Sequence, residues 1–140
     1  MEVTLAIIKP DAYKAKNAGK IIDRIINEGF NIKAMKQIHL SREQAEGFYE
    51  IHRGKPFFEE LTLFMSSGKC MVLALKKDNA VNQWRKTIGA TNPDNAEDGT
   101  IRKLYASSLG ENAVHGSDSD ENAEKEIGFF FTESELIANQ

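Results

Sequence analysis

Two short apolar runs constrain the fold of this chain more than any other feature of its sequence. The first is Val3–Lys9, which is mostly apolar and β-branched and stops at Pro10, and the second is Cys70–Leu75. Short apolar runs of this kind are typical of buried strands, and proline ends a strand because it lacks a backbone N–H group. We therefore expect the two runs to form the central pair of a β-sheet.

The segment between the two runs shows first a helical and then a strand pattern. Isoleucines recur at helical spacing from residue 21 to residue 26, and Gly29 suits the position just after a helix, so Gly19–Glu28 is predicted to be a helix. Phe30–Leu40 places apolar residues at every second position, with Lys36 as the exception. This alternation predicts a half-buried strand.

Helix-start signals divide the next segment. Ser41–Gln44 is a capping box, and the helix that it opens would carry Phe48 and Tyr49 on its packed face. Pro56 suits the first position of a further helix, with Phe57 pointing inward. We expect both helices to cover the sheet.

After the second apolar run, a helix at Asp78–Ile88 would be anchored by Trp84. Gly89–Gly99 is rich in Gly, Asn, Pro and Asp without periodicity, and a loop this long in a compact domain is usually functional. The remaining elements expected are a short helix at Thr100–Tyr105, a helix at Asp120–Ile127, a strand at Phe129–Phe131, and a terminal helix opened by a second capping box at Thr132–Glu135.

This order of elements reduces to βαββαβ. It predicts the α+β class, with a ferredoxin-like four-stranded antiparallel sheet and its helices on one face. The length of 140 residues suits a single domain covering residues 1–140.

Composition and charge exclude several classes of protein. Lys and Arg total 18 against 21 Asp and Glu, a net charge of −3, which argues against extensive coating of a nucleic acid. Cys70 is the only cysteine, so no intramolecular disulfide forms and a reducing cytoplasmic location is expected. The first residues lack the basic region of a signal peptide, and no apolar run approaches the ~20 residues of a membrane span.

One histidine lies in a setting that favours chemistry. His115 is followed by Gly116, which leaves room for a ligand to approach the backbone, and by the helix-capping residues Ser117, Asp118 and Ser119. A neutral imidazole is a nucleophile or a base, and a helix start attracts anions. Without further information, a surface histidine on a turn explains the same pattern.

Further segments carry a resemblance to a known family. The block NAVHGSDS at residues 112–119, followed by ENAEKEIGFFF, resembles the active-site signature of nucleoside diphosphate kinases. IKPD at 8–11, RGKPFF at 53–58 and GATNP at 89–93 resemble further blocks of that family in the expected order. The resemblance covers nearly the whole chain and implies the ferredoxin-like fold that the element order predicts.

The resemblance also implies an active site. Its catalytic residues would be His115, phosphorylated on Nδ1 (the pros nitrogen), with Lys9, Ser117 and Glu126 in support. Its nucleotide contacts would be Lys9, Tyr49, Phe57, Arg85, Thr91, Arg102, Leu109 and Asn112. Leu109 stands where we would expect valine, a change that keeps the contact apolar. Considered alone, each arginine would more simply be a surface charge, and Tyr49 and Phe57 would be core residues.

The implied reaction moves the γ-phosphate of a nucleoside triphosphate to a nucleoside diphosphate by a ping-pong route, with broad tolerance for base and sugar. Mg²⁺ would bind mainly through the nucleotide phosphates, with no certain protein ligand. The implied partners are ATP and other nucleoside tri- and diphosphates and further copies of the chain, with a hexamer favoured over a tetramer. No membrane and no specific nucleic acid is expected. The alternative is a non-catalytic, ferredoxin-like regulatory module that binds nucleotides or nucleic acid.

Overall fold

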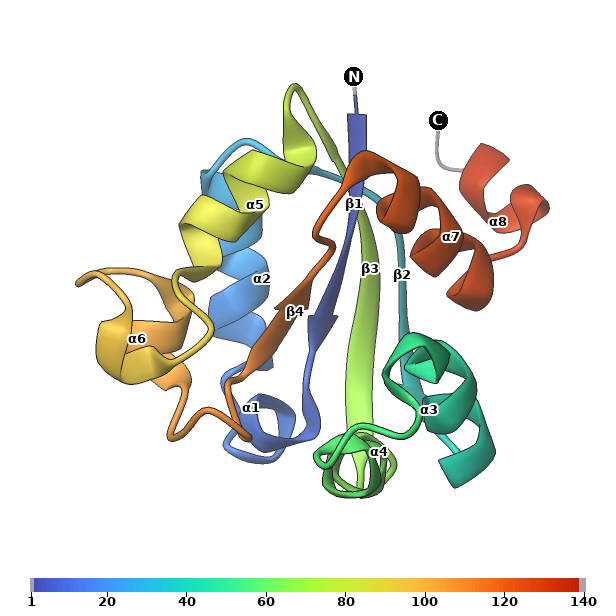
Figure 1. Ribbon diagram of the computed structural model, residues 1–140. Coiled ribbons are helices and arrows are strands. Elements are labelled where there is room, and N and C mark those ends of the chain that lie inside the picture. Colours follow the sequence, from blue (N-terminus) through green and yellow to red (C-terminus); the bar gives the residue numbers. More distant parts are fainter. Residues whose placement is uncertain (1, 139–140) are drawn as a thin grey trace.

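The computed structural model describes residues 2–138 and contains a four-stranded antiparallel sheet in the order β2–β3–β1–β4 (Figure 1). The strands are β1 (Glu2–Ile8), β2 (Asn31–His39), β3 (Lys69–Lys77) and β4 (Val114–Gly116). The two apolar runs form the central strands β1 and β3, with Leu5 paired with Ala74, as predicted. β2 is an edge strand, and its inward residues alternate as expected.

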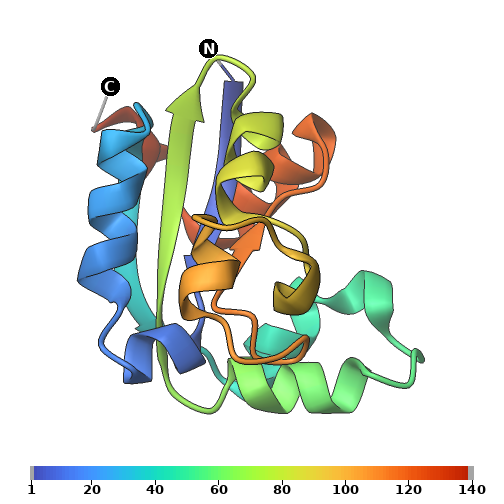
Figure 2. The same cartoon turned by 90° about the vertical axis from the view of Figure 1, so that its left-hand side faces the viewer.

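One layer of helices covers the first face of the sheet (Figures 1 and 2). It contains α1 (Pro10–Lys14), α2 (Ala18–Asn27), α5 (Ala80–Ile88) and α6 (Ile101–Tyr105). Ile21, Ile25 and Trp84 pack there against Ala6 and Ile8 of β1. These helices and strands give the predicted βαββαβ order, because α2 joins β1 to β2 and α5 follows β3.

A second layer of helices covers the opposite face, so the prediction that helices lie on one face was wrong. This layer contains α3 (Arg42–Phe48), α4 (Phe58–Met65), α7 (Asp120–Phe130) and α8 (Glu133–Ile137). Leu5 and Ile7 of β1 are buried on this side with Ile127 of α7. Strands that are apolar on both faces need cover on both, and β1 and β3 are of that kind.

The fourth strand was predicted at the wrong place. Phe129 and Phe130 belong to α7, which continues three residues past the predicted end at Ile127 and stops at Phe130. Their rings pack against Phe48 of α3, so tertiary packing overrides their strand propensity. The edge strand is instead Val114–Gly116, which contains the histidine and is too short for a periodic pattern.

The helix boundaries differ from the predictions by small amounts. α4 begins at Phe58, not at Pro56, and this shift makes Phe58 the buried residue while Phe57 remains 47% exposed. The two short 3-10 turns are Glu50–His52 and Pro93–Asn95. Both predicted capping boxes are present, at the starts of α3 and α8. None of the helices in residues 2–138 has the length and apolar content to cross a membrane.

Candidate active site

The edge strand β4 fixes the backbone of His115. It pairs with β1 so that His115 lies opposite Ile7, and the indole N–H of Trp84 donates to the carbonyl oxygen of His115 at 3.0 Å. A Cβ atom on Gly116 would lie 2.8 Å from Cδ1 of Trp84. Glycine is therefore required here by the close packing of Trp84, in addition to the space for a ligand that the sequence suggested.

The imidazole of His115 is held from one side by a carboxylate. Its Nε2 lies 2.9 Å from Oε1 of Glu126, and the hydroxyl of Ser117 donates to the same oxygen at 2.7 Å. Ser117 is fully buried and in turn accepts the backbone N–H of Leu5 at 3.1 Å. An imidazole whose Nε2–H donates to a carboxylate carries its lone pair on Nδ1, which is the nitrogen left to react.

A second set of contacts joins the end of β1 to the segment before β4. The ammonium of Lys9, which is only 7% exposed, donates to Oδ1 of Asn112 at 2.8 Å. The amide of Asn112 donates to the carbonyl of Thr91 at 3.3 Å, which ties the long loop to the pair. Burial, followed by the positive charge of Arg102, lowers the pKa of Lys9 to about 8. Lys9 is thus a buried cation whose ammonium is hydrogen-bonded to Asn112.

Ala113 bends the backbone between this pair and His115. Its φ angle of 71° lies in the left-handed region, and the N–H of Val114 donates to the carbonyl of Asn112 at 2.8 Å, which closes a γ-turn. Such a conformation costs about 1–3 kcal/mol for a residue with a side chain. The carboxylate of Asp11 accepts the N–H of Ala113 at 3.0 Å, and the N–H of Lys9 donates to the carbonyl of Ala113 at 2.8 Å. These two bonds hold the strained turn.

Sequence reasoning did not identify Asp11 as a site residue. An acidic residue in the first turn after a proline is typical of an ordinary helix start. Asp11 was part of the IKPD block at 8–11, but no role was predicted for it. Its contact with a residue 102 positions later has no local sequence signal.

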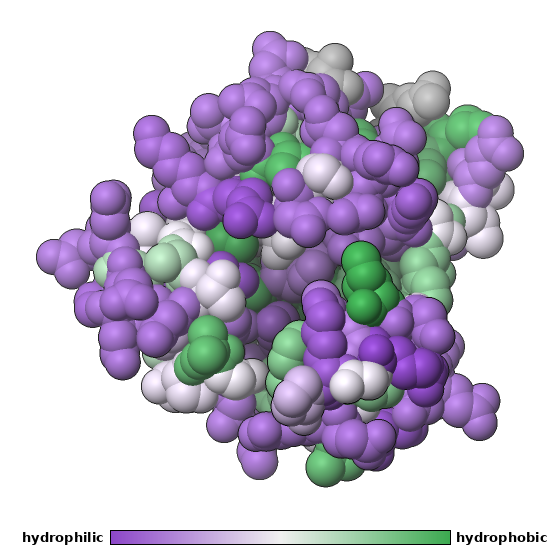
Figure 3. Space-filling model, viewed as in Figure 1, coloured by the Kyte–Doolittle hydropathy of each residue, from purple (hydrophilic) through white to green (hydrophobic). Residues whose placement is uncertain are grey.

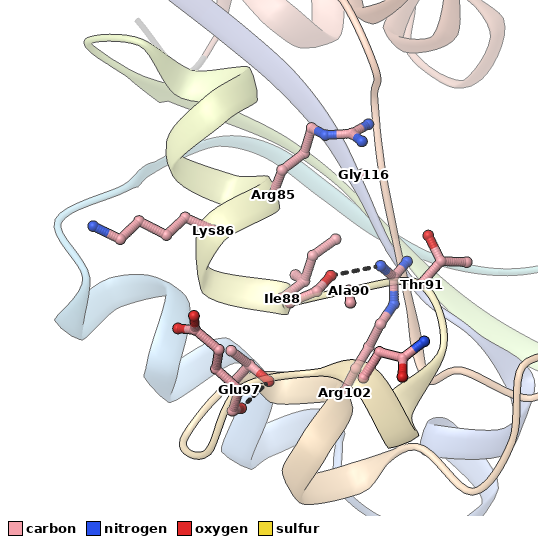
Figure 4. A pocket seen from close by; sticks show the side chains of 11 residues that line it. Arg85, Lys86, Ile88, Ala90, Thr91, Glu97, Arg102 and Gly116 are labelled. Carbon is pink, nitrogen blue, oxygen red and sulfur yellow. Dashed lines mark hydrogen bonds between the residues drawn. The ribbon is translucent and has the colours of Figure 1, made fainter.

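A cavity of about 560 Å³ opens beside β4, and Arg85, Thr91, Arg102 and Gly116 all line it (Figure 4). Arg85 extends from α5 and Arg102 from α6. The guanidinium of Arg102 donates to the carbonyl of Gly89 at 3.0 Å and to that of Val114 at 2.9 Å, while its buried Nε has no partner within residues 2–138. Burial, followed by the charge of Arg85, lowers the pKa of Arg102 to about 10.

This arrangement suits an anion. Two guanidinium groups that face the same cavity repel each other, and a phosphate between them would relieve that repulsion and accept hydrogen bonds. Arg102 also connects the cavity wall at Gly89 with the strand that carries His115, because it bonds the carbonyl of Val114.

The three remaining predicted residues, Tyr49, Phe57 and Leu109, do not line this cavity, and they differ in exposure. Tyr49 is buried, and its hydroxyl has no hydrogen-bond partner among the described residues. Burial, then the charge of Glu126, raises the pKa of that hydroxyl. Phe57 and Leu109 are 47% and 58% exposed. The mostly hydrophilic face in Figure 3 is hollowed between the α6 side and the α3–α4 side of the molecule.

No group of three or more His, Cys, Asp or Glu residues within residues 2–138 is placed to hold a metal ion. The described side chains therefore do not form a coordination site for a divalent cation. They are compatible with a cation that arrives on the phosphates of a nucleotide.

The family model for nucleoside diphosphate kinase matches residues 2–136. The chain belongs to the nucleoside diphosphate kinase family. A nucleoside diphosphate kinase of Syntrophotalea carbinolica is 55% identical over 98% of this chain and 100% of its own length. The family assignment therefore covers almost all of the sequence, as the motifs predicted.

Solved structures give the same result for the fold. The nucleoside diphosphate kinase of Aquifex aeolicus has a TM-score of 0.94 and 44% identity, over 96% of this chain and 97% of that one. The enzyme of Halobacterium salinarum in complex with CDP has a TM-score of 0.92 and 34% identity, over 96% of this chain and 90% of that one. The chain is thus a nucleoside diphosphate kinase with the ferredoxin-like fold of its family. The predicted enzyme activity and the predicted fold are both confirmed.

Proposed function

We propose that this nucleoside diphosphate kinase works through a phosphohistidine on Nδ1 of His115. The observation that carries the proposal is the Ser117–Glu126–His115 hydrogen-bond chain, which holds Nε2 and leaves Nδ1 to react. Arg102 supports it, because its guanidinium bonds the carbonyl of Val114, the residue before His115, and so places positive charge beside the strand that carries the nucleophile.

In the first half-reaction, the Nδ1 lone pair attacks the γ-phosphorus of a nucleoside triphosphate. The bond from that phosphorus to the bridging oxygen breaks, and the nucleoside diphosphate leaves with the electron pair. The carboxylate of Glu126 stabilises the positive charge that develops on the imidazole, because it accepts the Nε2–H. In the second half-reaction, a terminal oxygen of another nucleoside diphosphate attacks the same phosphorus, and the N–P bond breaks.

The cationic residues would neutralise the phosphates. We assign this role to Arg85 and Arg102, with the hydroxyls of Tyr49 and Thr91 as additional donors. Phosphoryl transfer depends on positioning and on stabilisation of charge at the phosphoryl oxygens more than on other covalent steps. Mg²⁺ would enter as part of the nucleotide substrate and would screen the charge of its phosphates.

Lys9 and Asn112 would hold the sugar 3′-hydroxyl and the phosphate end of the nucleotide. The two side chains already form one hydrogen-bonded pair, at 2.8 Å, next to the loop residue Thr91. A ligand that accepts a hydrogen bond from the ammonium would find it preorganised and poorly solvated, which strengthens the contact.

The lowered pKa of Lys9 predicts a pH dependence. The ammonium is positive below pH about 8 and neutral above it, so kcat/KM should fall as pH rises through this value, because the free enzyme loses a charge that attracts phosphate. Stopped-flow measurement of His115 phosphorylation between pH 6 and pH 10 tests this.

The variant Lys9→Gln should be phosphorylated more slowly than the parent at pH 7 and should lack the alkaline decline. The exposed residue Lys14 provides the control, because Lys14→Gln should keep the parent profile. A parent profile that stays flat up to pH 10 would contradict the role of Lys9.

The base would contact only apolar side chains. We assign Phe57 and Leu109, which are both exposed, as its contacts. Stacking on a π-face contributes roughly 1–3 kcal/mol per base and tolerates any base. The Halobacterium relative was solved with CDP, a pyrimidine nucleotide, which is compatible with such tolerance.

The proposed function predicts broad nucleotide use. Single-turnover phosphorylation by ATP, GTP, CTP, UTP and dTTP should give kcat/KM values within one or two decades, about 1.4–2.8 kcal/mol. A 3′-deoxy triphosphate should lose much more, mainly in the transfer step, because the contact with Lys9 and Asn112 disappears. A preference for one base above about a thousandfold would show that some side chain reads the base edge, and this assignment would be wrong.

We further propose that the chain is one domain that assembles into a homo-oligomer, a hexamer rather than a tetramer. The edge strand β2 supports assembly, because an exposed edge needs cover. A cytoplasmic location is proposed on the same basis as before, the single buried cysteine. No specific nucleic acid or membrane partner is proposed.

A further inference from the structure

One side chain that the mechanism above does not use contacts two of its residues. Phe48 is the last residue of α3, and its ring lies edge-to-face with the imidazole of His115, with centroids 5.5 Å apart and an interplanar angle of 73°. The same ring lies edge-to-face with Tyr49 at 4.9 Å and 87°. Phe48 therefore touches both the proposed nucleophile and a proposed phosphate contact.

The Phe48 ring also packs against α7. Phe129 and Phe130 pack against this ring with centroids 5.5 Å and 5.0 Å away. These three phenylalanines form an aromatic cluster, and α7 also carries Glu126, the hydrogen-bond partner of His115. Phe48 thus contacts both the imidazole and the helix that carries Glu126.

The hydrogen bond that His115 donates to Glu126 does not by itself fix the plane of the imidazole. When that bond breaks, the ring can turn about its Cβ–Cγ bond, which carries Nδ1 away from an incoming phosphate and frees Nε2 from Glu126. An edge-to-face neighbour opposes this rotation, because aromatic pairs prefer defined offset or T-shaped geometries. The Phe48 ring also fills space beside the imidazole that water would otherwise occupy.

We propose that Phe48 is a positioning residue that keeps Nδ1 of His115 directed at the phosphate and shields the resulting N–P bond from water. The inference rests on the proposed function, in which His115 accepts the phosphoryl group. It adds to that function a contact that preserves the ring orientation selected by Glu126, and it adds the lifetime of the phosphoenzyme. Phe48 touches no substrate in this account and acts through His115.

The test compares two leucine variants from the same aromatic cluster. Phe48→Leu removes the ring next to His115, whereas Phe129→Leu removes a ring that packs on Phe48 and has no ring contact with the imidazole among the described residues. Each enzyme is phosphorylated with ATP and Mg²⁺ and freed of nucleotide. The ratio of the two phosphohistidine isomers is then measured by ³¹P NMR after denaturation in alkali, and the hydrolysis of the native phosphoenzyme is followed with time.

The expected result is a specific change in Phe48→Leu. This variant should still take up phosphate, but a measurable share should be on Nε2. Its phosphoenzyme should hydrolyse about two- to tenfold faster, the range that corresponds to the loss of one aromatic contact. Its kcat should be lower, with little change in KM. Phe129→Leu should keep the Nδ1 isomer and the phosphoenzyme lifetime of the parent. Phe48→Tyr should also keep both, because it retains an aromatic ring at this position. If Phe48→Leu does not fold, Phe48→Met carries the same comparison.

Two other results have separate meanings. Phosphate only on Nδ1 with the parent lifetime in Phe48→Leu would overturn the role of Phe48, as would equal changes in the two leucine variants. A parent enzyme that forms no phosphohistidine at all would overturn the proposed function, and with it the inference that rests on it.

Discussion

The variant His115→Ala should take up no phosphoryl group from ATP and Mg²⁺, while the parent enzyme forms an acid-labile, alkali-stable phosphoenzyme. The variant removes the imidazole, including Nδ1, and keeps the backbone of β4, which is held by β1 and by Trp84. It should therefore fold and bind nucleotide. Labelling with γ-³²P-ATP, alongside equilibrium binding of ADP, measures both properties.

The chain offers a matched control for this experiment. His39 lies at the end of β2, where its ring contacts the carbonyl of Ser66 at 2.9 Å. His39→Ala should keep full labelling, because this ring has a structural contact and is not part of the site. Full labelling of His115→Ala would place the nucleophile on another residue.

Arg102→Ala should reduce kcat/KM by about 10²–10³-fold, a larger effect than its weakening of nucleotide binding, because charge neutralisation matters most in the transition state. It should also lower the free energy of unfolding by about 1–3 kcal/mol. The carbonyls of Gly89 and Val114 would both lose their guanidinium partner. Single-turnover kinetics, ADP binding and denaturant unfolding separate these effects.

The adjacent residue supplies the control. Lys103 is exposed on the same helix, so Lys103→Ala should leave both rate and stability close to those of the parent. Arg102→Lys keeps the charge but not the two-carbonyl contact, and it should fall between the parent and Arg102→Ala. The changes Ser117→Ala and Glu126→Ala should cost less than Arg102→Ala. A kcat/KM of Arg102→Ala within a factor of two of the parent would contradict the role assigned to Arg102.

Much of the fold followed from local sequence patterns. The central position of β1 and β3 follows from two apolar runs, and the α3 and α8 starts follow from capping boxes. These features are local, because a few neighbouring residues decide them. The family resemblance implied Arg85, Thr91 and Arg102 as nucleotide contacts, and these three residues line one cavity.

The features that were missed depend on residues far apart in the sequence. The extension of α7 through Phe130 depends on Phe48, and the bend at Ala113 depends on Asp11. Phe57 was expected inward, but the start of α4 at Phe58 turns it outward. No local pattern contains this information, because in each case a tertiary contact decides between two acceptable local conformations.

The pairing of β1 with β4 has a consequence for biosynthesis. The contacts that build the site join residues far apart along the chain: Leu5 with Ser117, separated by 112 positions, and Lys9 with Asn112, separated by 103. Closing such long loops is slow and comes after local structure has formed. A nascent chain that lacks β4 and α7 therefore has neither the histidine nor its carboxylate partner. An incomplete chain therefore cannot form the phosphohistidine. The enzyme becomes active only after β4 has paired with β1.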